Sequence, residues 1–208
     1  MKKVALFGVI GIFMMVLVSG CTVISLVAGT YNGLVAQREN TKASWGQVQN
    51  VYQRRADLVP NLIETVRGYA IHENDTFVSV TEARAKVGQI NIKADQIPSA
   101  VALQKFQQAQ GELSSSLSRL MVVSENYPNL KASESFRDLM VQMEGTENRI
   151  ANERRNFNKA AQDYNAYRSS FPHNIIADYY SFEVFPYFEA EAGANKVPKA
   201  DFKDLRQK

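Results

Sequence analysis

The N-terminal part of the sequence contains no charged residue between Val4 and Gln37. Such a run is longer than the ~20 residues that an α-helix needs to cross the hydrocarbon core of a bilayer. It follows Lys2 and Lys3, and positive charges ahead of an apolar segment stay on the cytoplasmic side. The sequence therefore predicts attachment to a membrane through the N-terminus, with the rest of the chain outside the cytoplasm.

Cys21 is the single cysteine of the chain and directly follows Val18, Ser19 and Gly20. Small residues before the cysteine fit a narrow peptidase cleft, and the thiol can take a diacylglycerol. Residues 1–20 have the charged start and apolar centre of a signal peptide. The pattern resembles the lipobox of bacterial lipoproteins. It predicts a lipid anchor, carrying fatty acids such as palmitate, on Cys21, and a membrane-proximal tether over residues 21–30.

The alternative is an uncleaved transmembrane helix in which Cys21 is incidental. The residues after Cys21 remain apolar, as in Val23 and Ile24, whereas most lipoproteins carry a polar tether there. We favour the lipoprotein, and both anchors predict the same topology in the bacterial envelope. Thr22 stands where an aspartate usually retains lipoproteins at an inner membrane. In a cell with two membranes this favours the outer membrane, with the domain on the periplasmic face.

Beyond residue 30 the apolar residues recur at spacings of three and four, which predicts helices rather than strands. A seven-residue repeat runs along the first expected helix, residues 31–70, as in a coiled coil. Its two seams are Tyr31, Arg38, Trp45, Tyr52, Val59 and Val66, and Leu34, Thr41, Val48, Arg55, Leu62 and Tyr69. Pro60 lies inside this helix, so the carbonyl of Ala56 loses its partner and a kink is expected there.

Three more helices are expected: residues 74–87, a segment that starts after Pro98 and ends at Tyr127, and residues 133–171. The last has a seam of Phe136, Met143, Ile150, Phe157, Tyr164 and Phe171. Amphipathic helices joined by short loops predict an all-α fold, a long-helix antiparallel up-and-down bundle of four helices over residues 31–171. A three-helix arrangement, in which the second and third helices are continuous, stays open.

The C-terminal tail, residues 172–208, differs from the bundle because aromatic residues crowd its first half. With the end of the preceding helix they are Tyr167, Phe171, Tyr179, Tyr180, Phe182, Phe185, Tyr187 and Phe188. We expect this tail to fold back over one end of the bundle as a plug. The alternative is an exposed aromatic surface for a partner or for lipid headgroups.

Several short motifs are specific enough to indicate a family. They include Arg54-Arg55-Ala56-Asp57-Leu58-Val59-Pro60-Asn61-Leu62, Glu125-Asn126-Tyr127-Pro128-Asn129-Leu130, Glu147-Asn148-Arg149-Ile150-Ala151, Phe157-Asn158 and Tyr164-Asn165. On these motifs the chain resembles the LemA family over about residues 31–190. The resemblance implies a membrane-anchored helical bundle of unestablished biochemical activity, with no catalytic residues to carry over. Members usually begin with a transmembrane helix, and the lipobox departs from that pattern.

The composition argues against several kinds of site. Lys2 and Lys3 contribute two of the formal charges of +3, so the remainder has no basic surplus for nucleic acid. One cysteine excludes an intrachain disulfide, and with only His72 and His173 no metal cage of thiolates and imidazoles can form. Both histidines lie at expected helix ends, where capping roles are common. We therefore expect no metal, no cofactor and no enzymatic activity.

The function that the sequence favours is structural. Such a protein would act as an adaptor that presents helix faces to an unidentified envelope protein or to a second copy of itself. The alternative is an unrecognised hydrolase that uses carboxylates in a groove near the aromatic tail. A pocket with converging carboxylates would favour the hydrolase, and an extended ridge without one would favour the adaptor.

Arg55 and Glu147 are charges on seams that should be apolar. If the first and last bundle helices are antiparallel and Tyr31 lies level with Phe171, Arg55 faces Glu147. The sequence then predicts a partly buried ion pair, with the planar guanidinium able to grip the carboxylate through two hydrogen bonds. The alternative is that both side chains reach opposite edges of the seam and never meet.

Overall fold

The computed structural model of the chain describes residues 2–70, 73–90, 92 and 98–189. Its helices are α1 (Lys2–Arg67), α2 (Asn74–Gln89), α3 (Ala100–Glu125), α4 (Pro128–Ala132), α5 (Glu134–Ser169) and α6 (His173–Tyr179). No strand occurs in that part of the chain, which confirms the all-α class. Four helices were expected after residue 30, and the short helices α4 and α6 are additional. Each starts at or next to a proline, Pro128 or Pro172, whose fixed φ suits the first turn of a helix.

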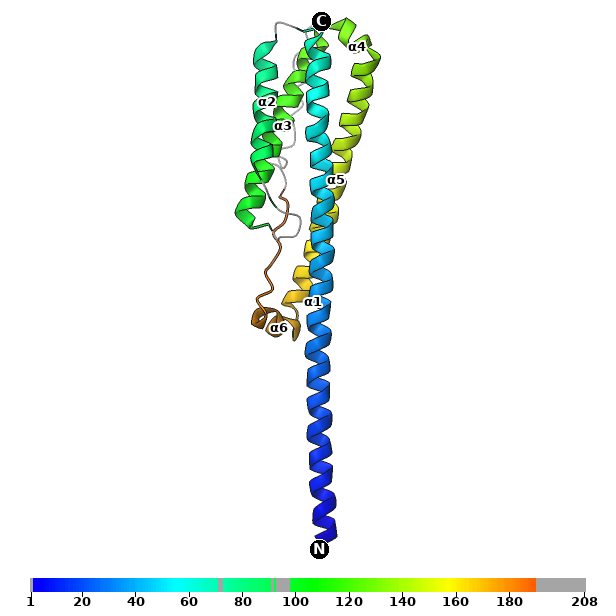
Figure 1. Cartoon of the computed structure of the whole chain (residues 1–208), viewed down its shortest axis with the longest axis vertical. Coiled ribbons are helices and arrows are strands. Elements are labelled where there is room, and N and C mark those ends of the chain that lie inside the picture. Colours follow the sequence, from blue (N-terminus) through cyan, green and yellow to red (C-terminus); the bar gives the residue numbers. More distant parts are fainter. Residues whose placement is uncertain (1, 71–72, 91, 93–97, 190–208) are drawn as a thin grey trace, which may run out of the picture.

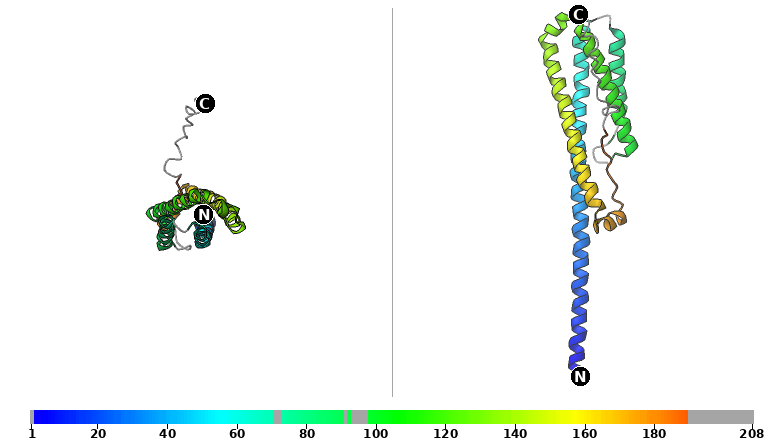
Figure 2. Two further views of the ribbon diagram at one scale, coloured as in Figure 1. Left: turned by 90° about the horizontal axis from the view of Figure 1, so that it is seen from above. Right: turned by 180° about the vertical axis from the view of Figure 1, so that it is seen from behind.

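The chain reverses direction between successive long helices, as Figure 1 shows. The most extensive contacts are those between α1 and α5 and those between α2 and α3. Helices α2 and α3 lie along the half of the α1–α5 pair that is distant from the N-terminus, and α6 lies near the other end of that pair (Figures 1 and 2). Helices α2 and α3 therefore flank the distal part of the α1–α5 pair, and other elements cover its proximal part.

Helix α1 is continuous over 66 residues, about 100 Å at 1.5 Å per residue. It includes residues 21–30, which the sequence suggested as a tether. The helix also continues through Pro60, where a kink was expected. The carbonyl of Ala56 accepts a hydrogen bond of 2.9 Å from Nε of Arg84 on α2. A side chain of a neighbouring helix thus replaces the partner that proline removes.

Two separate clusters of buried apolar residues hold the helices together. The proximal core consists of Leu34, Trp45, Val48, Tyr52, Leu103, Phe106, Ile150, Phe157, Ala161, Tyr164, Ile176, Ala177, Phe182, Phe185 and Phe188. The distal core consists of Leu58, Val59, Leu62, Val66, Ala70, Phe77, Val80, Ala83, Leu113, Leu117, Leu120, Leu130, Phe136 and Met143. Most expected seam positions of α1 and α5 are buried. The exposed exceptions include Tyr31, Tyr69 and Phe171, of which Phe171 is the most exposed at 81%.

Residues 182–189, here called the strap, form an extended segment along the proximal part of α5. Phe182, Phe185 and Phe188 are buried in the proximal core, and Trp45 stacks on Phe188 with ring centroids 6.0 Å apart. The aromatic tail was expected to plug one end of the bundle. In the described part it instead runs along the side, because α2 and α3 leave the proximal stretch of α1 and α5 uncovered. Residues 190–208 of the expected tail lie outside the described residues.

A tight turn at Ser181 leads from α6 into the strap. The amide of Phe182 donates to Ala177 O at 2.9 Å and that of Ser181 to Asp178 O at 3.2 Å, which is the Schellman pattern of a helix end. Ser181 has a φ of 54°, in the left-handed region. Glycine usually occupies this position because a side chain costs energy there.

We expect Ser181→Gly to stabilise the folded chain by about 0.5 to 1 kcal/mol, because it relieves the left-handed strain at a modest cost in backbone entropy. Thermal unfolding measures the change. Ser118→Gly is the control, since Ser118 is exposed inside α3 and glycine there should destabilise. A melting temperature that falls in Ser181→Gly as it does in Ser118→Gly would contradict the role of this turn.

A chain that ends after Ser181 should melt at a lower temperature than the full chain and bind a hydrophobic dye, because Trp45 and Phe157 lose their cover. The fluorescence of Trp45, the single tryptophan, should shift to the red as water reaches it. A chain that ends after Glu189 keeps the strap and is the control. Equal melts of the two truncated chains would show that the strap does not contribute to stability.

Candidate functional site

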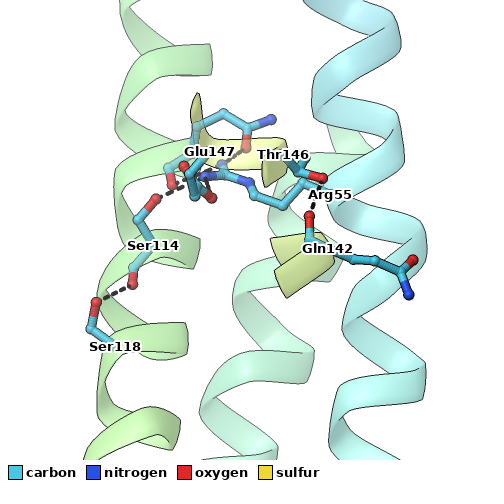
Figure 3. Close-up of polar contacts among 7 residues, drawn as sticks. Arg55, Ser114, Ser118, Gln142, Thr146 and Glu147 are labelled. Atoms are coloured by element: carbon cyan, nitrogen blue, oxygen red, sulfur yellow. Dashed lines mark hydrogen bonds and ion pairs between the residues drawn. The ribbon is translucent and has the colours of Figure 1, made fainter. Parts of the chain in front are cut away.

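Arg55 is the most deeply buried charged side chain of the described residues, with 2% of its surface exposed. Its Nη1 donates to Glu147 Oε1 on α5 at 2.9 Å and to Ser114 Oγ on α3 at 2.8 Å. Its Nη2 donates to the backbone carbonyl of Gln110 at 3.2 Å and also to the side-chain oxygen of Gln110. One guanidinium therefore connects α1 with both α3 and α5 (Figure 3).

We call Arg55, Gln110, Ser114, Thr146 and Glu147 the polar layer. It separates the proximal core from the distal core, since Ile150 belongs to the first and Met143 to the second. Thr146 is buried, and its hydroxyl donates to Gln142 O within its own helix at 2.7 Å (Figure 3). The guanidinium carbon of Arg55 also lies 5.1 Å from the ring centroid of Tyr52, within cation–π range.

The ion pair in the polar layer is asymmetric. The side chain of Arg55 is 2% exposed and that of Glu147 is 46% exposed, so the carboxylate lies at the rim. Two hydrogen bonds between these groups were expected, whereas one connects them in the structure. The other hydrogen bonds of Nη1 and Nη2 go to α3 instead. Sequence reasoning had placed Glu147 opposite Arg55 but did not identify Gln110 or Ser114, because it treated α1 and α5 alone.

Two donors in the polar layer are buried without a hydrogen-bond partner in the described part of the chain: Nε of Arg55 and Nε2 of Gln110. A buried unpaired donor costs ~1–3 kcal/mol. A hollow of about 70 Å³ adjoins them. This volume suits bound water, and it is well below the ~300 Å³ at which binding pockets for small molecules begin.

The contacts of Ser114 in the polar layer are structural. Its hydroxyl accepts a hydrogen bond from Arg55, and a guanidinium cannot accept a proton from it. Glu147 is paired with Arg55 rather than aimed at Ser114. The arrangement is suited to fixing the relative positions of three helices.

His173 is the histidine that the structure describes. His173 contacts Ser170 Oγ through Nδ1 at 2.8 Å and stacks on Tyr167 with ring centroids 4.1 Å apart, at the start of α6. His72 lies outside the described residues. Among the residues that the structure describes, no group of three or more His, Cys, Asp or Glu side chains is placed to hold a metal ion.

One hollow, of about 410 Å³, lies between α1, α2 and α3. Its described lining includes Gln49, Tyr52, Arg84, Phe106 and Gln110, with no carboxylate, histidine or cysteine. A second hollow beside the strap is lined by Arg155, Asn158, Lys159, Gln162 and Tyr187, again with no carboxylate. Neither hollow offers the converging carboxylates that a hydrolase near the tail would need.

The strap is bound through its backbone by side chains of α5. Asn165 Nδ2 donates to Phe185 O at 2.9 Å, and Asn165 Oδ1 accepts from the amide of Phe185 at 3.0 Å. Asn158 makes the same pair of bonds with Phe188, at 2.9 and 2.8 Å. An extended segment has no hydrogen bonds of its own, so each buried backbone group needs such a partner.

Further donors complete the binding of the strap. Tyr164 donates to Glu183 O at 2.9 Å, and burial raises the pKa of Tyr164, so its hydroxyl keeps the proton that it donates. Arg168 and Arg154 donate to Phe182 O and Glu189 O at 2.6 and 2.9 Å. Sequence reasoning missed this role. The signal was present, since the aromatic-asparagine pairs Phe157-Asn158 and Tyr164-Asn165 are one heptad apart.

Cys21 is exposed on α1, in a stretch whose large apolar side chains are also exposed, from Phe13 to Leu26. By length and composition, this helix is long and apolar enough to cross a membrane. A signal sequence near an N-terminus meets the same criterion, so the finding fits both anchors considered above.

A double-mutant cycle tests the ion pair. Arg55→Met and Glu147→Met should each destabilise the chain, Glu147→Met because it leaves a buried charge without its counter-ion. The two losses should be non-additive by about 1 to 3 kcal/mol in urea unfolding, as for residues of one network. The exposed pair Lys159–Asp163, 3.1 Å apart, is the control and should couple by less than about 0.5 kcal/mol. Strictly additive losses at Arg55 and Glu147 would rule out the coupling.

Comparison with known proteins gives one consistent result. A model of the LemA family matches residues 44–202. Magnetosome protein MamQ 2 of Paramagnetospirillum magneticum is 28% identical over 184 residues, which cover 81% of this chain and 67% of that protein. Magnetosome protein MamQ of Magnetospirillum gryphiswaldense is 27% identical over 184 residues, 80% of this chain and 68% of that protein. Protein LemA of Metamycoplasma hominis is 25% identical over 166 residues, 78% of this chain and 72% of that protein.

Because the family model spans most of the sequence, including both heptad-spaced asparagines and the polar layer, the chain belongs to the LemA family.

Proposed function

We propose that this chain is a membrane-anchored structural and interaction module of the bacterial cell envelope. The observation that carries the proposal is the continuity of α1, which joins an exposed apolar stretch to the distal core in one helix. A continuous helix transmits position and orientation from the membrane to the far end of the domain. Such a device suits a spacer or adaptor, and it needs no reaction chemistry.

The domain in this proposal is an antiparallel up-and-down bundle of α1, α2, α3 and α5. Its support is the alternating direction of the long helices and the antiparallel contacts of α1 with α5. The ring of Trp45 lies 5.5 Å from that of Phe157, and Thr41 Oγ1 donates to Ala160 O at 3.2 Å. We include α6 and the strap in the same folding unit, because their apolar side chains complete the proximal core.

The names of the relatives support a structural role. Two of those named above are called magnetosome proteins and one is called LemA, and none of these names describes a reaction. We propose that the helix faces of the bundle contact another envelope protein or a second copy of this chain. The hydrolase has less support, since the described lining of the two hollows considered above includes no pair of carboxylates near the strap.

We further propose that the anchor is a lipid on Cys21 after removal of residues 1–20, with the domain outside the cytoplasm. The exposure of Cys21 supports the proposal, because the thiol is accessible to a modifying enzyme. In a cell with two membranes, Thr22 favours the periplasmic face of the outer membrane. An uncleaved span through the same residues is the competing anchor.

Labelling cells with a tagged fatty acid tests this anchor. The wild-type chain should take up the label and begin at Cys21 by mass spectrometry, while Cys21→Ala should stay unlabelled as a full-length precursor. Ser25→Ala is the control, because it changes a nearby small polar residue outside the lipobox. A wild-type chain that retains Met1 would instead establish the uncleaved transmembrane helix. Fractionation of the same cells tests the choice of membrane.

A further inference from the structure

We propose that α6 carries an aromatic foot that inserts into the headgroup region of the bilayer. The foot consists of Phe171, Ile175 and Tyr179, which follow one another at intervals of four residues. Ile175 and Tyr179 lie on one side of α6, because residues four apart in a helix are neighbours, and Phe171 lies in the turn just before the helix. The inference rests on the proposed attachment of α1 to a membrane and adds a second, separate membrane contact.

The foot is exposed although α6 itself is firmly packed. Phe171 is 81% exposed, Ile175 59% and Tyr179 80%. The opposite side of α6 buries Ile176 and Ala177 in the proximal core. The exposed face is therefore held in a fixed orientation by the packing of the helix behind it.

The height of α6 along α1 identifies the partner as lipid. The ring of Tyr31 lies 4.9 Å from that of Tyr180 and 5.7 Å from that of Phe182, so the end of α6 is level with Tyr31. Val27 packs against the proximal core, whereas α1 from Phe13 to Leu26 is exposed. Figure 1 shows α6 at the end of the bundle that faces this bare part of α1.

Membrane dimensions place that level at the bilayer surface. A span that starts after Lys3 needs ~20 residues to cross the ~30 Å hydrocarbon core and so ends near Val23. Val27 and Tyr31 then lie about 6 and 12 Å beyond the hydrocarbon, at 1.5 Å per residue. The headgroup layer is ~5–8 Å thick on each side, so Val27 lies within it and the Cα of Tyr31 lies a few ångströms outside it, with its side chain tilted back toward the N-terminus and the bilayer. A lipid on Cys21 gives nearly the same height, because its acyl chains enter the bilayer at that residue.

The chemistry of the foot suits this layer. Tyrosine is enriched at membrane interfaces, where the ring meets acyl chains and the hydroxyl meets water. Asp178 borders the foot, but its carboxylate is paired with Arg168 at 2.8 Å, which offsets its repulsion from anionic lipid. The exposed apolar stretch of α1 thus ends at about the height of the exposed face of α6. This is expected if both surfaces contact the same bilayer.

Quenching by lipids tests the foot in the full-length precursor, reconstituted into vesicles of phosphatidylethanolamine and phosphatidylglycerol. Each of three variants carries one tryptophan besides the native, buried Trp45. The substitutions are Tyr179→Trp in the foot, Phe13→Trp in the middle of the span, and Val141→Trp on the exposed surface of α5. Lipids brominated near the headgroup should reduce the emission of Tyr179→Trp and shift it to the blue. Lipids brominated deep in the acyl chains should quench Phe13→Trp, and neither lipid should affect Val141→Trp. Equal melting temperatures show that the exposed substitutions leave the fold intact.

The outcomes separate the foot from the anchor. If Phe13→Trp is quenched and Tyr179→Trp behaves like Val141→Trp, the foot is overturned while membrane attachment stands, and the aromatic face is left for a protein partner. If Phe13→Trp is not quenched, the precursor does not insert α1 into the bilayer, and the foot, which depends on that height, fails with it. Quenching of both Phe13→Trp and Tyr179→Trp, with Val141→Trp unaffected, supports both contacts.

Discussion

The buried guanidinium of Arg55 is the interaction on which the geometry of the bundle depends. The two apolar cores on either side of it are built from a heptad repeat, and such a repeat tolerates a slip by one heptad with similar apolar contact. A buried cation does not, because a slip would remove it from Glu147, Gln110 and Ser114 at once. Its net contribution to stability is small after desolvation, so we interpret its role as fixing one register of α1, α3 and α5.

The strap extends the same principle to a segment that is not helical. Pro186 lacks a backbone N–H and keeps Phe185 in an extended conformation, so residues 182–189 have no hydrogen-bonded structure of their own. The amide of asparagine supplies one donor and one acceptor, which match the C=O and N–H of a single strap residue. The heptad spacing of Asn158 and Asn165 lets α5 bind the strap on one face while its apolar seam packs on α1.

The parts of this structure that sequence could predict are those set by local periodicity. The all-α class and most buried seam positions followed from the repeat, and the register argument led to Arg55 and Glu147 because it needed only two helices. The strap could not be predicted, since an extended segment has no helical period and its partners lie on another element. The hydrogen bond from Arg84 to the carbonyl of Ala56 could not be predicted from the sequence either, because it depends on where α2 packs against α1.

A single helix in a membrane fixes the height of a domain but leaves it free to tilt and rotate about that helix. Two contacts at the same level remove much of this freedom. The strap and α6 pack on α1 through Tyr31 and the proximal core, so an aromatic foot on α6 would be rigidly connected to α1. In the proposed placement, the bundle extends about 60 Å from the membrane surface between Val27 and Arg67, at 1.5 Å per residue. Over that length a small change in the tilt of α1 moves the distal core by many ångströms. A partner that binds at the distal core would therefore meet a surface in a defined position only if a second membrane contact fixes the tilt of the bundle.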